Sequence, residues 1–378
     1  MFKRKNIILL ALLLLSLSLF GQQFKVATLN CNWLSCPDFG PTNENLQLNN
    51  IAQVILNVNA DIIALQEIGT STSFATVDEI VSILGAGWAG AIVPWDANNC
   101  SQNQAIIYKK SKVQSVSASL ITNGGSSQNW SNGRFPVLYN VNFLTNEGIV
   151  PISFINIHAK ALSDLGSYAR RQAASQDLKL LLDGSAYRTK RIILIGDYND
   201  YLIGTQCGAC SPKNSPYKNF MDDIQNYKGL TQNLYDTYYN SPVIDNIIIS
   251  NELFANYKNG SALRDVASTS SINNYRNTTT DHYPITVALL FGTATDIEEI
   301  EDAQQFIIYP NPVKDELKIM NYELRIMNVE ILDITGKIIY NSSFIINNSI
   351  NVSSLTQGIY LLKIETEKGF FIKKFVKQ

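Results

Sequence analysis

The chain up to residue 291 alternates apolar runs of strand length with stretches of helical spacing. Apolar runs predict strands over 24–29, 61–65, 105–108, 113–120, 137–143, 152–157, 191–195, 243–249 and 285–290. Helices are predicted over 43–57, with an apolar side of Leu46, Ile51, Val54 and Ile55, and over 167–182. Several successive strands lack an intervening helix, which excludes a simple parallel doubly wound sheet. We therefore predict a mixed α/β sandwich of two packed sheets.

The pattern changes after this region. Residues 293–304 are acidic and lack aromatic side chains, so we predict a linker there. Residues 305–378 are rich in Ile, Tyr and Val in short runs separated by turn signals. This pattern predicts a small all-β sandwich of about seven strands. It contains no His and no Cys, so we place the chemistry in residues 22–292.

The N-terminal residues 1–21 have the pattern of a secretory signal peptide. Lys3, Arg4 and Lys5 precede a short apolar run over 7–20, and Gly21 is a small residue before a cleavage point. The alternative is a membrane anchor, but the run is shorter than the ~20 residues that span a bilayer. We expect cleavage, export through the periplasm and no stable membrane insertion afterwards.

Composition limits the classes of function. Of the 378 residues 46% are hydrophobic and 16% charged, as in a chain with a sizeable core. The net charge is −2, and becomes −5 once the three basic residues of the signal peptide are removed. This balance argues against passive nucleic-acid binding through counterion release. It leaves open an enzyme that meets phosphate through a metal and a few basic groups.

The five cysteines of an exported chain allow at most two internal disulfides. Cys207 and Cys210 lack further ligands at zinc-site spacing, so a local disulfide is predicted. Cys31 alternates with Asn30 and Asn32 on a predicted strand, so it points away from them and is expected to be a buried thiol. Disulfide pairing of Cys36 with Cys100 is then the second candidate.

The two histidines of the chain both lie beside predicted strands, in the segments FINIHAKA and TTDHYPI. Histidine is readily poised for proton transfer near neutral pH, so His158 and His282 are candidate catalytic residues. The alternative is a pair of structural histidines, buried with hydrogen-bond partners.

Polar side chains also stand at the ends of four other predicted strands. They occur in the segments ATLNCNWL, DIIALQEI, RIILIGDYND and VIDNIIIS. Polar groups at the mouths of buried strands are unfavourable unless they are paired or bind something. Each segment alone is weak evidence, because a Gly-Asp after a strand is often a simple turn. Together with the histidines they indicate a site.

These segments resemble, in order, the motifs of the endonuclease/exonuclease/phosphatase superfamily. TLNCN resembles the first motif, LQE the second, NIHAKA the third, GDYND the fourth, VIDNIII the fifth and TDHYP the sixth. The resemblance covers residues 24–291. It implies a four-layer α/β sandwich, in which two packed mixed sheets are flanked by helices, and the hydrolysis of phosphate esters.

The resemblance also implies a divalent-metal site. Glu67 would bind the metal, with Asn30, Asn32 or Asp281 nearby. Oxygen ligands without sulfur suit a hard cation, so Mg²⁺ is expected, with Mn²⁺ and Ca²⁺ as alternatives. In several members of the family an aspartate stands where this chain has Asn32, which leaves Glu67 as the surest ligand.

The other motif residues receive roles by the same resemblance. His282 would be the general base, oriented by Asp245, while Asp197 and Asn199 would hold the water and the phosphate. His158 would hydrogen-bond a phosphate oxygen or protonate the leaving oxygen. General acid and base groups are typically worth about 10²–10⁴-fold each.

Three further residues are candidate contacts to the substrate phosphate. Asn156 lies in the third motif, Lys160 follows His158 by two positions, and Arg134 in GRFP resembles a phosphate-contacting arginine of deoxyribonuclease-like members. For Arg134 the alternative is a simple surface arginine. Arg170 and Arg171 open a predicted helix, where an anionic partner or plain solvation would each account for them. Aromatic residues in predicted loops could stack bases or cover a lipid headgroup: Trp95, Trp130 and Tyr201.

Two departures from the family pattern leave questions open. In the deoxyribonuclease branch a carboxylate orients the third-motif histidine, whereas the comparable stretch here offers only Gln102 and Gln104. What orients His158 is therefore open. Asn246 replaces an aromatic residue that commonly continues the fifth motif.

Residues 305–378 resemble the type A sorting domain of the Bacteroidetes type IX secretion system. The matching segments are YPNPVKDELKI, ILDITGKIIY, INVSSLTQGIYLLKIE and the closing KKFVKQ. The resemblance implies the type IX machinery as a partner and a secreted or cell-surface location. Without it, the module would be only an accessory β-sandwich for carbohydrate or surface binding.

The sequence thus predicts a secreted, metal-dependent phosphodiesterase that acts on nucleic acid as a non-specific endonuclease. One alternative is a phosphodiesterase or phosphatase for sphingomyelin or another small phosphate ester. The other is a non-catalytic surface binding protein on the same fold, against which the intact acid and histidine residues argue.

Overall fold

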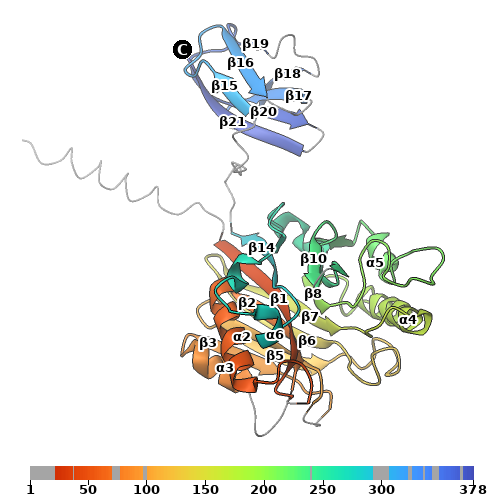
Figure 1. Ribbon diagram of the computed structural model, residues 1–378. Coiled ribbons are helices and arrows are strands. Elements are labelled where there is room, and N and C mark those ends of the chain that lie inside the picture. The colour runs from red at the N-terminus through yellow and green to blue at the C-terminus, as the bar shows by residue number, and fades with distance from the viewer. Residues whose placement is uncertain are drawn as a thin grey trace, which may run out of the picture. The chain divides into compact units, whose positions relative to one another are not determined.

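The computed structural model describes ten stretches of the chain: residues 22–36, 38–69, 77–96, 100–238, 241–292, 306–321, 326–334, 337–342, 349–366 and 369–378. The predicted signal peptide and linker lie outside these residues. The described residues divide into two compact units, one over 22–292 and one that begins at 306 (Figure 1). Each unit has its own hydrophobic core.

The first sheet of the larger unit is mixed. Its strands lie in the order β13 (Leu263–Arg264), β14 (Ile285–Phe291), β1 (Gln22–Leu34), β2 (Ile62–Ile68), β4 (Asn103–Lys109) and β3 (Trp88–Ile92). Strands β1 and β2 are parallel, and the other neighbours are antiparallel.

The second sheet is mixed as well. Its order is β5 (Val113–Leu120), β6 (Val137–Thr145), β7 (Gly148–His158), β8 (Ile192–Asp197), β12 (Asp245–Ser250) and β9 (Tyr227–Gly229). Only β7 and β8 are parallel. Two short strands pair separately, β10 (Tyr235–Tyr238) and β11 (Ser241–Pro242).

Helices cover the outer face of each sheet, so the unit has four layers. Helices α2 (Glu44–Val58) and α3 (Val77–Leu84) pack on the first sheet, and α4 (Leu165–Leu182) and α5 (Lys218–Met221) on the second (Figure 1). Between the sheets lies a third apolar layer with residues from both. The short helices are α6 (Tyr275–Thr278), η1 (Asn251–Asn256) and η2 (Ala267–Thr269). The predicted four-layer α/β sandwich is confirmed.

Alternation along each strand decides which side chains reach the layer between the sheets. On β1, Phe24 and Val26 enter that layer, while Ala27 and Leu29 face α2. On β7, Ile152 and Phe154 enter it, and Ile155 faces α4. The apolar rows of several strands therefore point into one shared core, and the residues that continue those rows come together at its edge.

Local signals set the helix starts, with one correction to the prediction. The Asn43 side chain caps α2 by accepting from the Leu46 amide, and Asp164 caps α4 in the same way through Ser167. The prediction that Leu46 belongs to the apolar side of α2 is wrong, since 42% of its surface is exposed. The buried stripe instead includes Gln47, whose side-chain amide donates to the Cys31, Asn32 and Thr279 carbonyls.

The predicted cysteine chemistry is present. Disulfides join Cys207 to Cys210 and Cys36 to Cys100, and Cys31 is a buried free thiol. Cys31 continues the β1 row that faces α2, away from Asn30.

The smaller unit is built of antiparallel sheets. One sheet has the order β15 (Phe306–Tyr309), β16 (Glu316–Asn321) and β19 (Ser349–Asn351), and the other β18 (Ile338–Ser342), β17 (Ile326–Leu332), β20 (Gly358–Thr366) and β21 (Gly369–Lys377). Buried aliphatic residues and Phe375 form its core. These seven strands of the described part agree with the predicted all-β module.

Candidate active site

The polar residues of the motifs meet at one edge of the layer between the two sheets. His158, Asp197 and Asp245 are direct neighbours in register across β7, β8 and β12. From the other sheet, the Asn30 amide crosses to Asp197, with Nδ2 at 3.0 Å from Oδ2. Each of these side chains continues an apolar row of its strand, which explains why strand-end residues far apart in sequence form one site.

Glu67 is held by two donors from the first motif. Asn30 Nδ2 lies 3.1 Å from Glu67 Oε1, and the Trp33 amide donates to Oε2 at 3.0 Å. The main chain of Glu67 is in the left-handed region, with φ of 58°. A non-glycine residue in this conformation is strained, and such strain is found often at functional sites. The direction of the carboxylate is thus set by these two donors and by an irregular point within β2.

His158 points its Nε2 at two carboxylates. The atom is 3.4 Å from Glu67 Oε1 and 3.7 Å from Asp197 Oδ2. Its side chain is almost fully buried. His158 therefore faces the same point as the two acids.

His282 forms an ion pair with Asp245. Its Nδ1 is 2.9 Å from Asp245 Oδ2, and both side chains are buried. The Thr280 hydroxyl donates to the Asn30 carbonyl and accepts from the His282 amide, which ties the sixth motif to the first. This arrangement leaves His282 Nε2 directed away from Asp245, with Asp281 Oδ1 4.0 Å from it.

The turn after β8 is shaped by a glycine. Gly196 has φ of +134°, and a Cβ there would lie 2.1 Å from the Ile157 carbonyl oxygen. No other residue fits this close approach of β8 to β7. Beyond it, the Asn199 amide donates to Asp197 Oδ1 at 2.8 Å, and Asn199 itself has φ of 49°. The Gly-Asp of the fourth motif is therefore not a plain surface turn.

Burial disfavours the ionised form of both acids. Desolvation raises the pKa of Glu67, against the hydrogen bond from Asn30 and the charges of His282 and Arg134. Desolvation and the nearby Asp245 raise the pKa of Asp197 to about 7. Two neighbouring carboxyl groups with raised pKa values form a site at which a bound cation would be stabilised.

The surroundings shift the pKa values of the two histidines in opposite directions. Burial, Arg134 and His282 hold the pKa of His158 well below its usual value. Burial opposes the charge on His282 too, but the attraction and hydrogen bond of Asp245, with Asp197 and Asp281, raise its pKa to about 10. Without a metal His282 is thus protonated at neutral pH. A cation beside it would lower this pKa and favour the neutral base.

The donor set fits a hard divalent cation. Glu67, His158 and Asp197 offer ligand atoms within 4.8 Å of one another, as do Asp197, Asp245 and His282. Asn30 adds an amide group between Glu67 and Asp197. The carboxylates lie side by side with raised pKa values, which a cation would relieve. Carboxylate oxygens of this kind suit Mg²⁺, Mn²⁺ or Ca²⁺.

The two other predicted metal ligands are Asp281 and Asn32. Asp281 Oδ1 lies 4.0 Å from His282 Nε2, and its negative charge raises the pKa of Glu67. The Asn32 backbone amide donates to Asn30 Oδ1 at 2.9 Å, and Asn32 has φ of 50°. Asn32 thus belongs to the irregular part of β1 that follows Asn30.

Asn156 joins the two sheets. Its Nδ2 donates to the Leu65 and Ala105 carbonyls at 3.0 Å each, and its Oδ1 accepts from Gln66 at 2.8 Å. The side chain is fully buried. Its predicted contact with the substrate phosphate gains no support, because both amide hydrogens are used within the protein.

Arg134 is buried, so the alternative of a simple surface arginine is wrong. Its Nε donates to the His158 carbonyl at 2.9 Å and one terminal nitrogen to the Ala159 carbonyl at 2.7 Å. A further bond goes to Gln102. Arg134 therefore fixes the main chain that carries His158, and its charge lies close to the acids.

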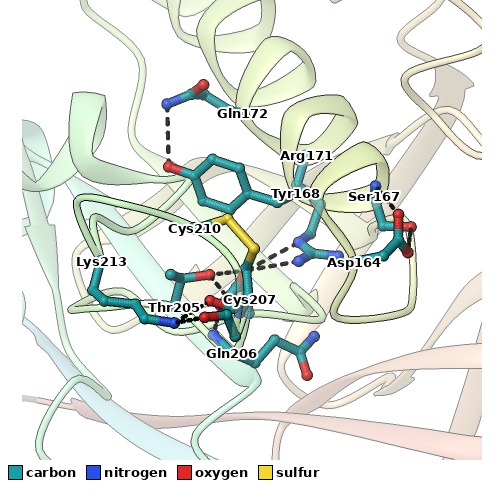
Figure 2. The surroundings of a disulfide bond; sticks show 12 residues. Asp164, Ser167, Tyr168, Arg171, Gln172, Thr205, Gln206, Cys207, Cys210 and Lys213 are labelled. Atoms are coloured by element: carbon teal, nitrogen blue, oxygen red, sulfur yellow. Dashed lines mark hydrogen bonds and ion pairs between the residues drawn. A yellow bond between two sulfur atoms is a disulfide. The ribbon is translucent and has the colours of Figure 1, made fainter.

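The neighbouring arginines Arg171 and Arg170 differ in burial. Arg171 reaches from α4 toward the loop of the Cys207–Cys210 disulfide (Figure 2). Its Nη2 lies 2.8 Å from Asp200 Oδ2. Both side chains are fully buried, so the anionic partner of Arg171 is internal. Arg170 is more open, and donates to the Gln128 carbonyl and Asn132.

Asp200 anchors the disulfide loop directly behind the fourth motif. Besides Arg171, its carboxylate accepts from the Thr205 hydroxyl at 2.9 Å and the Gln206 amide at 2.8 Å. Arg171 in turn donates to the Lys160 and Leu162 carbonyls. One buried ion pair thus links the loops on both sides of the site.

Replacement of Asp200 by asparagine should lower the free energy of unfolding by about 3 kcal/mol, because Arg171 then stays buried without its counter-charge. Urea unfolding measures the change. The matched control is Asp222→Asn, which breaks the exposed pair with Lys218 and should alter stability by less than about 1 kcal/mol. Equal changes in the free energy of unfolding for the two substitutions would show that the buried pair contributes no more to stability than the exposed pair.

Several supporting residues were not among the predicted site residues. Gln66, Thr280 and Trp33 hold motif residues in place through hydrogen bonds, and Asp200 holds Arg171. Gln66, Thr280 and Asp200 lie inside the quoted motifs, next to the residues that received roles. The missing information was the partner of each, which only the packed sheets supply.

The aromatic predictions are met in part. Trp95 lines a groove beside the site together with Trp33. Trp130 is buried and donates its Nε1 to the Gly124 carbonyl, so the prediction that it could stack bases from a loop is wrong. Tyr201 is not among the residues that line this groove.

Buried carboxylates and histidines thus meet at the shared edge of a four-layer α/β sandwich. Residues 27–253 match the model of the Endonuclease/Exonuclease/phosphatase family, more than half of the chain. The protein therefore belongs to the endonuclease/exonuclease/phosphatase family, whose members are phosphoesterases that typically depend on a divalent metal.

Solved structures with a similar course of the chain include three from different organisms. The human Nocturnin catalytic domain with bound sulfate anion is 18% identical, with 71% of this chain and 95% of that chain covered and a TM-score of 0.47. The Bacteroides thetaiotaomicron mannosyl-6-phosphatase is 16% identical, with 71% and 100% covered and a TM-score of 0.46. The endonuclease/exonuclease/phosphatase from Beutenbergia cavernae is 14% identical, with 94% and 100% covered and a TM-score of 0.47. No curated protein gives a significant match.

Residues 307–378 match the model of a secretion system C-terminal sorting domain. This match indicates export through the type IX secretion machinery to the cell surface or beyond. Among the helices of the described residues, none combines the length and apolarity needed to cross a membrane.

Proposed function

We propose that this protein is an exported, metal-dependent phosphodiesterase that cleaves nucleic acid as a non-specific endonuclease. The observation that carries the proposal is a groove of about 450 Å³ beside the acids and histidines. Its lining combines the cations Arg134, Lys160 and Arg170 with the rings of Trp33 and Trp95. Cations that follow a phosphate backbone beside rings that stack on bases are the features of single-strand binding without sequence preference.

The charges of the groove are concentrated enough to affect one another. The pKa of Lys160 is lowered, first by burial and then by the positive charges of Arg170 and Arg134. An anionic ligand would relieve this repulsion. Because the net charge of the whole chain is negative, attraction of a polyanion must come from such a local cluster.

Glu67 and Asp197 would hold the metal, with Asn30 between them, and Asn32 and Asp281 would lie around that centre. A bound divalent cation would neutralise charge on the scissile phosphate. The chain itself supplies two carboxylates fixed by Asn30, the Trp33 amide and the Asn199 amide. They are thus prearranged before the substrate arrives.

His282 is the proposed general base. Asp245 holds its Nδ1, so we assign the proton of the attacking water to Nε2. The resulting imidazolium is stabilised by the same buried carboxylate. This division of roles is that of a histidine–carboxylate pair, in which the acid fixes the ring and offsets its charge.

On the other side of the site, His158 and Asn199 are proposed to meet the phosphate. His158 Nε2 would hydrogen-bond a phosphate oxygen or protonate the leaving oxygen, from its place beside Glu67 and Asp197. Asp197 and Asn199 would hold the water and the phosphate. Lys160 would pair with a phosphate in the groove. The positive charge of Arg134 would stabilise the negative charge of that phosphate and of the phosphate at His158.

The test offers the purified protein several substrates: plasmid DNA, RNA, sphingomyelin and a mannose phosphate. Each is assayed with Mg²⁺, Mn²⁺ or Ca²⁺, with and without chelator. We expect metal-dependent cleavage of nucleic acid at internal positions, absent from His282→Ala. Turnover of only sphingomyelin or the sugar phosphate would replace the nuclease assignment, and turnover of no substrate would favour a binding protein.

Loss of a groove cation should weaken nucleic-acid binding without changing the chemistry. For Lys160→Ala we expect a lower affinity for single-stranded DNA and a salt slope reduced by about 1, as for one lost phosphate contact. Arg170→Ala should act in the same direction. Binding is measured by fluorescence anisotropy across a salt series.

The control for these variants is Lys258→Ala. Lys258 is exposed, and its backbone amide donates to the carbonyl of Ala288 on β14, the residue that pairs with Lys25 of β1. This substitution changes the net charge by the same amount as Lys160→Ala, but Lys258 is not among the residues that line the groove. A salt slope that falls equally in Lys258→Ala would mean that the protein responds only to total charge, against the groove as the binding surface.

A further inference from the structure

An aromatic pair stands on the loop that follows the first motif. The rings of Trp33 and Phe39 are stacked, with centroids 4.6 Å apart and planes 25° apart. Trp33 lines the groove beside the acids, and Phe39 has 52% of its surface exposed. Single exposed apolar residues are common on proteins, but a stacked pair that borders a groove is the kind of surface that binds a flat ligand.

The backbone that carries Trp33 is strained. Asn32, Trp33 and Ser35 have φ of 50°, 61° and 69°, in the left-handed region that bulky side chains rarely adopt. Gly40 closes the loop, because an added Cβ there would lie 2.4 Å from the Asn32 carbonyl oxygen. Such strain persists only where the surroundings enforce it, and it occurs often at ligand sites. The strain therefore agrees with a ligand-binding role for Trp33.

Contacts on both sides of Trp33 hold the loop in place. The Trp33 amide donates to Glu67 Oε2 at 3.0 Å, and the Trp33 carbonyl accepts from the Cys36 amide at 3.0 Å. The disulfide from Cys36 to Cys100 ties the loop to a second segment that lines the groove. The aromatic pair is therefore arranged before a ligand arrives, which reduces the entropy that binding would lose.

The shape and surroundings of the pair suit a flat ring better than a rounded cation. Two rings within 25° of parallel present a flat face, whereas quaternary ammonium groups are held in cages of several rings. The groove also carries Lys160 and Arg170, which would repel the choline of a lipid headgroup and attract a phosphate. A flat ring joined to phosphates is the chemistry of a nucleotide.

The position of Trp33 indicates which base would be stacked. Its amide bonds the carboxylate of Glu67, which the proposed function assigns to the metal at the scissile phosphate. A base on the indole would thus belong to a nucleotide beside that phosphate. In a duplex, neighbouring bases cover both faces of such a base, so a protein ring reaches it only after it is unstacked. A single strand offers bases that are already accessible.

We propose that Trp33 and Phe39 form a base-stacking platform that makes the enzyme select single-stranded over duplex nucleic acid. Trp33 receives the base, and Phe39 is the positioning residue that fixes the plane of the indole. The inference rests on the proposed function for its substrate and narrows nucleic acid to strands with unstacked bases. Stacking on an aromatic side chain corresponds to about 5- to 100-fold in affinity per base, whatever the base.

The experiment measures, by fluorescence anisotropy, how residues 22–378 bind three labelled probes of equal length. The probes are oligothymidine, its duplex with oligodeoxyadenosine, and an abasic strand. All proteins carry His282→Ala, so that the probes stay intact with Mg²⁺ present. The abasic strand keeps the phosphates and lacks the bases, so its difference from oligothymidine reports stacking. We expect oligothymidine to bind about 5- to 100-fold more tightly than either other probe, and Trp33→Ala to remove this preference.

Variants of Phe39 test the platform without altering Trp33. Phe39→Ala should reduce the preference for oligothymidine by about 5-fold, and Phe39→Tyr, which keeps the ring, should retain it. The matched control is Tyr187→Ala, which also removes an aromatic ring. Tyr187 lies shortly before β8, whose opposite end carries Asp197. This control should show the preference of the parent protein.

Three results would each overturn the platform: equal binding of oligothymidine and the abasic strand, a preference that survives in Trp33→Ala, or the same loss in Tyr187→Ala. Binding of sphingomyelin vesicles that Phe39→Ala weakens, with oligothymidine binding unchanged, would also overturn it. The proposed function is judged separately by turnover. Cleavage of plasmid DNA without the preference would refute the platform alone, and the preference without cleavage of any nucleic acid would refute the nuclease assignment alone.

Discussion

Replacement of His282 by alanine should lower phosphodiester hydrolysis by about 10²- to 10⁴-fold, the usual contribution of a general base. His282 Nε2 is the ring nitrogen turned away from Asp245, whose carboxylate bonds Nδ1 at 2.9 Å. No other histidine can take over, because His158 faces Glu67 and Asp197. The measurement is the initial rate of metal-dependent cleavage under single-turnover conditions.

The same variant should also be less stable without metal. The folded-state pKa of His282 is raised to about 10, so its ion pair stabilises the protein fully below the unfolded pKa of about 6.5. That contribution is lost as pH rises through about 10. The stability difference between wild type and His282→Ala should therefore be largest near pH 6 and shrink toward pH 10, as followed by urea unfolding.

Two controls separate lost chemistry from lost structure. Added imidazole can enter the space left by the ring and should partly restore the rate of His282→Ala. Asp245→Asn keeps the side-chain shape but removes the charge that fixes the ring, and should also reduce the rate strongly. Full activity of His282→Ala under conditions where it is folded would exclude His282 as the base.

Replacement of Glu67 by glutamine should abolish tight metal binding while preserving the fold. Loss of a charged ligand removes several kcal/mol of cation stabilisation, which corresponds to roughly 10³-fold or more in affinity. Calorimetric titration with Mg²⁺ or Mn²⁺ measures it. Cleavage of any substrate should fall in parallel, because no other acidic residue occupies the place between Asn30 and the Trp33 amide.

Without metal the Glu67→Gln protein should be at least as stable as the wild type at neutral pH. Burial raises the pKa of Glu67, so ionisation of this group opposes folding once pH exceeds its unfolded value of about 4.3. The neutral amide avoids that penalty. The wild type should regain the advantage on addition of metal. Equal metal affinities of the two proteins would contradict the assignment of Glu67 as ligand.

The strands and the motif residues could be predicted because their causes are local. Apolar runs and alternation mark the strands, and the six motifs lie at strand ends, where polar residues interrupt buried runs. Cys31 shows the strength of this logic, since alternation alone placed it opposite to Asn30, and the structure buries it in the α2-facing core. Leu46 shows its limit, because it is exposed while the neighbouring Gln47 is buried and donates to main-chain carbonyls.

Residue roles that depend on a partner could not be predicted in the same way. Arg134, Arg171 and Asn156 are polar residues in or near the motifs. The sequence offered Arg134 and Asn156 to the substrate, and Arg171 to an anionic partner or to solvent. The structure instead engages them with the His158 carbonyl, Asp200 and the opposite sheet. A buried polar group must find partners within the fold, and these lie between 24 and 91 residues away in sequence.

The sequence by itself determined the two-unit organisation, the mixed α/β sandwich and the set of acids and histidines, because period, composition and motif order are properties of short segments. Only the tertiary structure decided which of these side chains face one another. Two sheets had to pack before Asn30 could bond Asp197 and His282 could bond Asp245. Those contacts join different strands of two sheets, and their electrostatics arise from burial that no single segment carries.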